Sequence, residues 1–338
     1  MKTVVSVQEM DEVQIKPQAE VAEWRRLVAL EIGTRWRDRS RWVTVGCPCC
    51  SEGTARSAFA HVGIAYVECT SCGTLYAPQR PDELSLREWY KHSDSSRFWR
   101  ERLLSASSEM RWDKIVMPRA QWILDGIAEY QPNATRLLDI SASGRALVDE
   151  VLAGAPALEA AVTGAAAELE SRSGERVIVV PTDVSGLAAL GPVHLVTAFD
   201  AFDRAADLRA LVRAAHEALA PGGVLLATLP VSSGFEVQSL WDRSPTVFPP
   251  DKLNLPSVAG LLRMFAGPSW ELLELSTPGM FDVEIVRRIV EEAPGADWPR
   301  TLRALVLGTD ATGTQLFTEY LQSRRLTSFA RLVARRKD

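Results

Sequence analysis

The stretch Leu137-Leu138-Asp139-Ile140-Ser141-Ala142-Ser143-Gly144-Arg145 combines an apolar run, an aspartate and a turn of small residues. Residues 146–152 follow it with the pattern of the first turns of a helix. A strand, a tight loop and a helix N-terminus in this order suit a nucleotide-like cofactor, because loop amides and the helix dipole face the ligand. Glycines usually let the backbone approach such a ligand closely, yet Gly144 is the only glycine in the stretch.

Strand and helix patterns alternate on the carboxyl side of this stretch. The predicted strands are 136–140, 160–164, 176–180, 194–199 and 223–229, and the predicted helices are 145–153, 165–172 and 206–220. Pro221-Gly222-Gly223 is expected to end the last helix and open the next strand. This alternation predicts an α/β fold with a doubly wound, mostly parallel sheet. We expect the rest to contain a loop over 230–256, a helix at 257–266, a strand at 270–276, helices at 299–307 and 313–323, and a closing strand at 327–335.

The five cysteines all lie within residues 47–72. Cys47/Cys50 and Cys69/Cys72 form two C-x2-C pairs, a spacing typical of a zinc ribbon. Four thiolates can surround zinc tetrahedrally and leave no open position, so such a site is structural. Cys49 is either a spare thiol or a ligand in place of Cys50. Two disulfides or free thiols are the alternative to zinc.

The N-terminal part divides into three further segments by composition. We expect 1–42 to be a leader and helix, 43–80 the zinc ribbon, 81–132 a helical cap or linker, and 133–338 the α/β domain. In the segment 19–38, apolar residues at helical spacing predict an amphipathic helix with Arg25, Arg26 and Glu31 in water. The aromatic and basic residues of 81–130 suit either a cap over a cofactor cleft or a nucleic-acid surface.

Composition favours the cap and excludes several partners. The 338-residue chain is 46% hydrophobic with a net charge of −5, so nothing in its overall charge favours nucleic acid. No apolar run approaches the roughly 18 residues that a membrane span needs, and no signal-peptide core is visible. We therefore expect a cytoplasmic protein whose partner is a small-molecule substrate or another protein, with oligomerisation left open.

Several segments together resemble the class I S-adenosylmethionine-dependent methyltransferases, in particular a bacterial subgroup with an N-terminal cysteine zinc ribbon. The resemblance covers roughly residues 40–338 and depends on the order of its segments. These are the ribbon knuckles, 72–76, 78–81, 89–90, 117–120, 194–200, 219–225 with its "L-x-P-G-G" pattern, 276–283 and 317–321.

The resemblance implies a seven-stranded sheet with helices on both faces and a reversed final strand. It also implies cofactor contacts at the carboxyl ends of the first strands. Asp139, Ser141, Ser143, Gly144 and Arg145 would face the methionine half of S-adenosylmethionine. The segment 164–166 would face the ribose, Asp183 the adenine amine, and Phe199 with Asp200 the floor of the site.

The cofactor motifs of this chain depart from those of the family. The family's "D-x-G-x-G-x-G" loop has Ser141, Ser143 and Arg145 in glycine positions, and the second strand is followed by no acid until Glu168. Arg145 either places like charge near the sulfonium or pairs with the cofactor's carboxylate. Relatives often carry histidines at three positions that are occupied here by Arg204, Lys252 and Phe329.

Candidates for catalysis are Asp200, Asp203 and His92. The two aspartates follow the fourth strand, where they orient a substrate hydroxyl or, alternatively, cap the helix at 206–220. A base is needed only if the methyl acceptor must lose a proton. Two hypotheses follow. The chain is an active methyltransferase for a sugar or natural-product intermediate, or a catalytically silent relative that binds a partner, such as an active paralogue.

Overall fold

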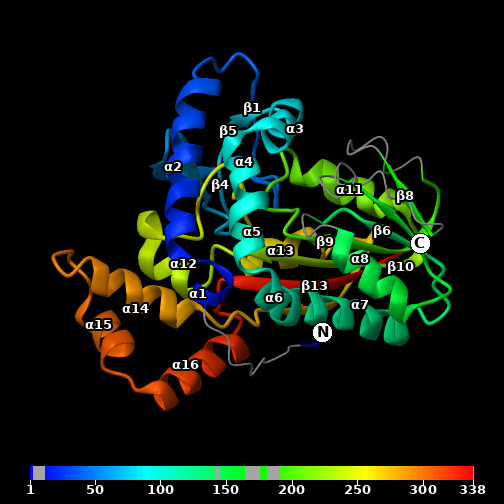
Figure 1. Ribbon diagram of the computed structural model, residues 1–338. Coiled ribbons are helices and arrows are strands. Elements are labelled where there is room, and N and C mark those ends of the chain that lie inside the picture. The colour runs from blue at the N-terminus through cyan, green and yellow to red at the C-terminus, as the bar shows by residue number, and fades with distance from the viewer. Residues whose placement is uncertain (3–11, 142–144, 164–175, 181–186, 188–189, 338) are drawn as a thin grey trace.

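A seven-stranded sheet forms the centre of the computed structural model, which describes residues 1–2, 12–141, 145–163, 176–180, 187 and 190–337 (Figure 1). Its strands are β6 (Arg136–Asp139), β7 (Glu159–Val162), β8 (Val177–Val179), β9 (Val193–Phe199), β10 (Leu219–Pro230), β12 (Trp270–Ser276) and β13 (Phe329–Arg336). Their order is β12-β13-β10-β9-β6-β7-β8, and β13 runs antiparallel to both neighbours. The predicted doubly wound sheet is therefore confirmed.

Each face of the sheet has its own hydrophobic core, because successive strand residues point to opposite faces. Leu137 packs with α7 (Met117–Tyr130) and α8 (Arg145–Gly154), whose Ile123 and Leu147 are buried in the same cluster. Leu138 packs on the other face with α11 (Leu208–Ala218) and α13 (Val258–Met264). The short strand β6 is thus buried on both sides, as expected for the centre of a parallel sheet.

Two predicted features differ in the structure, and a third cannot be compared. The segment 230–256 was predicted as a loop, but it contains α12 (Phe235–Leu240), the 3-10 turn η3 (Trp241–Arg243) and β11 (Asn254–Leu255). The prolines of this segment fall between these short elements rather than within them. The Pro-Gly-Gly turn was expected to precede its strand, but it lies within β10 at an irregularity between Leu219 and Val224, and Gly222 has φ +77°. The predicted helix 165–172 lies outside the described residues.

The C-terminal helices extend from the sheet as a separate lobe (Figure 1). They are α14 (Asp282–Glu292), α15 (Arg300–Leu307) and α16 (Ala311–Ser323). The prediction missed α14, although Val283, Val286 and Val290 follow helical spacing and are buried in the lobe's core. The helices predicted at 299–307 and 313–323 are confirmed as α15 and α16.

The cysteine-rich segment forms a small antiparallel ribbon. It contains β1 (Trp42–Thr44), β2 (Ala55–His61), β3 (Ile64–Cys69), β4 (Leu75–Tyr76) and β5 (Gln79–Pro81). Its main sheet has the order β11-β4-β3-β2, so a strand from the α/β part completes it. The buried Arg80 reinforces this junction by donating to Oδ1 of Asn254 at 2.6 Å and to the carbonyl of Leu253 at 3.1 Å.

A helical layer covers the open side of the molecule. It contains α1 (Glu12–Ile15), α2 (Gln18–Arg35), α3 (Glu83–His92), α4 (Asp94–Phe98), η1 (Trp99–Leu103), α5 (Leu104–Ala106), α6 (Ser108–Arg111) and η2 (Trp112–Val116). Figure 1 shows α2 and the column of α4 and α5 standing side by side beside the sheet.

The amphipathic helix predicted at 19–38 is confirmed as α2, but two of its charges are not in water. Glu31 is buried and its carboxylate accepts the amide of Asp94 at 2.6 Å at the start of α4. Arg25 donates to the carbonyl of Pro245 at 2.8 Å. Both charges turn inward because α2 is packed between the cap and α12. Arg26 is exposed, as expected.

No helix within the described ranges is both long and apolar enough to cross a lipid bilayer.

Candidate functional site

A cavity of about 1280 Å³ lies between the carboxyl ends of the parallel strands and the helical layer. At the sheet it is bounded by Ser141 after β6, Thr163 after β7 and Asp200 after β9. The strand β6 lies between β7 and β9, so the crossovers on its two sides run in opposite directions. Open α/β sheets bind ligands at such a switch point, outside the carboxyl ends of the strands.

The sheet itself identifies the fold. Numbered from β6, its order is 3-2-1-4-5-7-6 with strand seven reversed, which is the arrangement that the sequence resemblance implied. The chain has the class I methyltransferase fold. A cluster of four cysteines near its N-terminus is consistent with the zinc-ribbon subgroup.

Similarity to known proteins is found among solved structures. No protein-family model matches the chain, and no curated protein matches it. Among solved structures, it is similar to a plantazolicin methyltransferase, BpumL, in complex with SAH, at 9% identity and a TM-score of 0.46, covering 75% of this chain and 94% of that one. An O-methyltransferase from a trans-AT PKS multienzyme of Brevibacillus brevis, also with SAH, has 14% identity and a TM-score of 0.45, covering 69% and 76%. Coclaurine N-methyltransferase bound to N-methylheliamine and SAH has 14% identity and a TM-score of 0.41, covering 65% and 70%.

Asp139 is the last residue of β6 and is hydrogen-bonded at the edge of the sheet that bounds the cavity. Its side chain is fully buried, and Oδ1 accepts from the hydroxyls of Ser141 and, at 2.6 Å, Thr197. The Ser141 hydroxyl also accepts the amide of Phe199 at 2.9 Å. Burial raises the pKa of Asp139, although these donors oppose the rise. The serine at a glycine position is therefore bonded back into the fold and ties β6 to β9.

Of the remaining predicted cofactor residues, the structure describes Phe199 and Arg145. Ser143, Gly144 and Asp183 lie outside the described residues, so their predicted roles stay predictions. Phe199 is fully buried and stacks under Trp122, with ring centroids 5.4 Å apart and planes 13° apart. Trp122, which the sequence did not single out as a site residue, therefore lines the cavity above it.

Arg145 does not point into the cavity. It is the first residue of α8, and its Nε donates to Oδ1 of Asp149 at 2.7 Å, one turn further along that helix. It is absent from the cavity wall, whereas its neighbours Ala146 and Leu147 are part of it. Neither alternative for Arg145 is therefore seen. Its guanidinium places no positive charge on the cavity wall, and it is not positioned there to bind the cofactor's carboxylate.

The two candidate aspartates are held in ion pairs. Oδ2 of Asp200 lies 2.8 Å from Arg119, and the buried Asp203 pairs closely with Lys252. A third pair joins Arg204 to Asp251 at 3.0 Å. The helix-cap alternative is wrong for both, since α11 is capped by Asp207, which accepts the amide of Ala210 at 2.9 Å. Position alone suggested a cap, but the chain between β9 and α11 is long enough to place a later aspartate there.

The surroundings of these aspartates set their pKa values in opposite directions. Burial opposes the charge of Asp200, but the Arg119 guanidinium and the Lys252 ammonium outweigh it and hold the pKa below its ordinary value. Burial dominates at Asp203 and raises its pKa, even though Lys252 opposes the rise. Asp200 also adopts φ +55°, an uncommon conformation for a residue other than glycine. Asp200 is therefore a fixed carboxylate on the cavity wall, whereas the fully buried Asp203 lies behind that wall.

The third candidate, His92, does not line the cavity. His92 ends α3 with its side chain exposed, 3.7 Å from Glu88 on the same helix, and it is not part of the cavity wall. Helical periodicity explains this, because Trp89 of the same helix takes the buried face and His92 lies at the helix end.

Charges on the cavity wall are unevenly distributed. The described residues that line it include eleven arginines and lysines and six aspartates and glutamates. The wall therefore carries an excess of cations, although three of them pair with acids behind it: Lys16 with Glu12, Lys252 with Asp203 and Arg331 with Glu274. Such a concentration of one sign focuses the field and attracts ligands with negative charge. The order of residues in the sequence does not reveal this excess, because the cations come from segments far apart in the chain, among them α2, the cap, α7 and β13.

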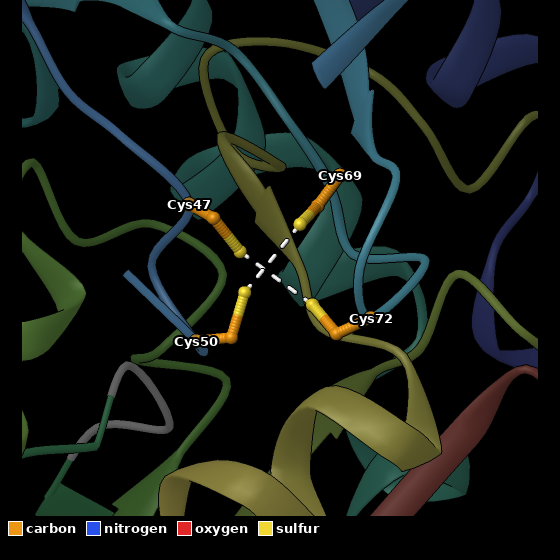
Figure 2. Close-up of side chains that lie close together, drawn as sticks. All are labelled: Cys47, Cys50, Cys69 and Cys72. Carbon is orange, nitrogen blue, oxygen red and sulfur yellow. Dashed lines mark hydrogen bonds between the residues drawn. The ribbon is translucent and has the colours of Figure 1, made fainter. Parts of the chain in front are cut away.

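The ribbon brings four of the five cysteine thiols together. The Sγ atoms of Cys47, Cys50, Cys69 and Cys72 lie within 4.8 Å of one another. Figure 2 shows them converging on one point from two knuckles, with Cys47 and Cys72 3.6 Å apart and Cys50 and Cys69 3.5 Å apart. A zinc tetrahedron with bonds of about 2.3 Å needs sulfurs roughly 3.8 Å apart, so this donor set fits the metal. The disulfide alternative does not fit, since all five cysteines are free thiols.

Backbone geometry around the knuckles supports the thiols. Gly73 adopts φ +72°, as the turn after the second knuckle required. Burial raises the pKa of the Cys69 thiol, but the amides of Ser71 and Cys72 outweigh it and leave that pKa lowered. Cys49 lies outside the group of four and packs against α13, where a Cβ added to Gly260 would meet its sulfur at 3.2 Å. Cys50 and not Cys49 thus belongs to the cluster.

Proposed function

We propose that the protein is an S-adenosylmethionine-dependent methyltransferase acting on a small molecule bound beneath the helical cap. The observation that carries this proposal is the cavity at the switch point of a class I methyltransferase sheet. Its wall reaches Ser141 and Thr163, at the carboxyl ends of β6 and β7, where the fold places the cofactor.

The described residues leave room for the cofactor at this edge. The Ser141 side chain is bonded to Asp139 and the Arg145 side chain to Asp149, so neither fills the cavity. When bound, S-adenosylmethionine supplies a methyl group already activated on its sulfonium. The protein then has to orient the acceptor and exclude water. The cap aromatics Trp99 and Trp112, together with Trp122, form the apolar part of the wall that does this.

The cationic wall supports a substrate that carries an acidic group. The cap contributes Arg87, Lys91, Arg100, Arg111 and Lys114 to one side of the cavity. Guanidinium and ammonium groups bind carboxylates and phosphates by charge-assisted hydrogen bonds. A sugar or natural-product intermediate bearing such a group fits this wall.

A catalytically silent binding protein remains the alternative function. Exposed aromatic surface along 81–130 would have favoured it. Trp89 is buried instead, and Tyr90 and Trp99 line the cavity, while Trp112 is 37% exposed. This distribution supports a ligand cavity over a protein-docking face.

We also propose that Cys47, Cys50, Cys69 and Cys72 hold a structural zinc ion. Four thiolates close the coordination shell, so the metal would stabilise the ribbon and take no part in methyl transfer. The ribbon in turn supports the cavity, because β11 of the α/β part pairs with β4.

Calorimetric titration with S-adenosylmethionine and S-adenosylhomocysteine tests the methyltransferase function. We expect micromolar binding to the wild type and at least a tenfold loss in Thr163→Tyr, whose ring would occupy the cavity beside β7. The matched control Thr34→Tyr changes an exposed position of α2 and should keep the wild-type affinity. Absence of heat and of thermal stabilisation at millimolar ligand would reject the enzyme and leave the binding protein.

A further inference from the structure

A second polar site lies in the same cavity, at Glu236 on α12. Its side chain is only 1% exposed yet forms part of the cavity wall. Oε1 accepts from the hydroxyl of Ser244 at 2.6 Å, whereas Oε2 is buried and accepts no hydrogen bond within the described part of the chain. A buried acceptor without a partner is costly. Nothing in the methyltransferase function described above uses this carboxyl.

An arginine with an equally unused donor faces the same space. Arg25 of α2 donates one Nη2 bond to the carbonyl of Pro245, but its buried Nε has no acceptor among the described residues. Burial lowers the pKa of Arg25, and the nearby carboxylates of Glu12 and Glu236 only partly offset this. Both side chains line the cavity, and their unpartnered atoms, Oε2 of Glu236 and Nε of Arg25, are buried behind its surface.

Other groups around Glu236 are already engaged. Oδ1 of the buried Asp282 accepts the amides of Glu236 at 3.1 Å and Ser328 at 2.7 Å. The Lys16 ammonium pairs with Glu12 at 3.5 Å. The Thr246 hydroxyl is a second hydroxyl donor toward the Glu236 carboxylate beside Ser244. Both groups favour the charged carboxylate. Burial and the Asp282 charge prevail and raise the pKa of Glu236 to about 7.

Aromatic rings surround the pair. Trp24 of α2 packs at 4.9 Å from Trp99 and at 5.4 Å from Phe248, measured between ring centroids, and all three rings line the cavity. The Arg25 guanidinium lies over Phe248 at 5.3 Å. Flat apolar walls with two polar atoms suit a ring that carries a polar substituent. Figure 1 places α12 beside α2 and α14, on the side of the molecule away from α8 and β6.

We propose that Glu236 and Arg25 form a subsite for a hydroxyl group carried on a ring of the substrate. In the proposed complex the hydroxyl donates to the Glu236 carboxylate and accepts from the Arg25 guanidinium, since a hydroxyl group does both. The ring packs among Trp24, Trp99 and Phe248. The subsite rests on the proposed function in one respect: the substrate binds in this cavity. It binds the end of the substrate that lies away from the cofactor edge.

Two ring classes share this chemistry, and titration with small probes separates them. We would titrate the full-length protein at pH 8 with 4-methylphenol and with methyl β-glucopyranoside, following ligand signals by saturation-transfer nuclear magnetic resonance. The probe without a hydroxyl donor is 4-methylanisole. The variants are Glu236→Leu and the matched control Glu291→Leu, which changes an exposed glutamate on α14. Glu236→Gln serves as a second variant that keeps the shape of the side chain.

We expect at least one hydroxylated probe to bind the wild type and the Glu291→Leu control equally. Its affinity should fall at least tenfold in Glu236→Leu and about fivefold in Glu236→Gln, because hydrogen bonds to a charged group are worth more than neutral ones. The proposal is overturned if both Glu236 variants retain wild-type affinity, if 4-methylanisole binds as well as 4-methylphenol, or if neither hydroxylated probe binds the wild type. If the wild type binds the hydroxylated probes but does not bind S-adenosylhomocysteine, the methyltransferase function alone is rejected.

Discussion

The cysteine cluster and the edge of the sheet at β6 differ in how well sequence motif and structure agree. In the ribbon the C-x2-C spacing is complete, and the four thiols converge as the spacing implied. At the edge of β6 the glycine motif is mostly lost, yet a cavity is still present. Ser141 bounds the cavity with its hydroxyl bonded to Asp139, and Arg145 lies outside the wall and pairs with Asp149. A departure from a motif therefore removes a site only if the new side chain points into it.

The largest effect is expected in the ribbon. Cys69→Ser should reduce zinc from about one ion per chain to a small fraction and unfold the ribbon, since structural zinc contributes roughly 10–16 kcal/mol in isolated fingers. Metal analysis of freshly purified protein and thermal unfolding measure this. Cys49→Ala is the control and should keep its zinc while losing about 1 kcal/mol of packing. Stoichiometric zinc in Cys69→Ser would show that the cluster is not the metal site.

The next effect concerns the ion pairs under the cavity. Lys252→Met leaves the fully buried Asp203 without its partner and should lower the free energy of unfolding by about 3–5 kcal/mol. Arg56→Met breaks an exposed pair with Glu68 in the ribbon and should cost less than about 1 kcal/mol. Denaturant unfolding at pH 7 compares the two variants. Equal losses would mean that the floor of the cavity is no more sensitive than the ribbon surface.

A third test uses the pH dependence of Glu236. Its pKa is raised in the folded state from the ordinary value of 4.5 to about 7, so the folded protein holds this proton more tightly. The stabilisation is complete below about pH 4.5 and is lost as pH rises through 7, amounting to about 3 kcal/mol. Glu236→Gln should remove this part of the pH dependence, measured as unfolding free energy between pH 5 and 8. If Glu236→Gln keeps the wild-type pH dependence of the unfolding free energy, that dependence belongs to another titratable group.

The smallest effect is expected at Arg145. Arg145→Ala breaks an ion pair within α8 and removes a side chain that is only 12% exposed, so it should lower stability by about 1 kcal/mol. Its affinity for S-adenosylhomocysteine should stay within threefold of the wild type, because the side chain does not line the cavity. Titration of both proteins measures this. A tenfold gain on losing the arginine would show that its charge opposes the cofactor, and a tenfold loss that it binds the carboxylate.

Patterns within a few residues of each other were predicted well. The amphipathic α2, the strands β6 to β10 and the closing β13 follow from periodicity, because packing against one core selects a fixed side-chain spacing. Short helices within proline-rich segments, such as α12, were missed because their few buried residues give no periodic signal. The pairing of β11 with β4 was equally invisible, since it joins segments far apart in the chain.

The sequence by itself determined the cysteine knuckles, the chemical departures of the loop 141–145 and, through the resemblance, a seven-stranded sheet with a reversed final strand. Only the tertiary structure decided where the departing side chains point. It paired Asp203 with Lys252, 49 residues away, and placed Glu236 and Arg25 in one cavity wall. The physical reason is that the spacing of nearby residues decides on which face of its helix or strand a residue lies. A partner across the fold depends on how separate elements pack.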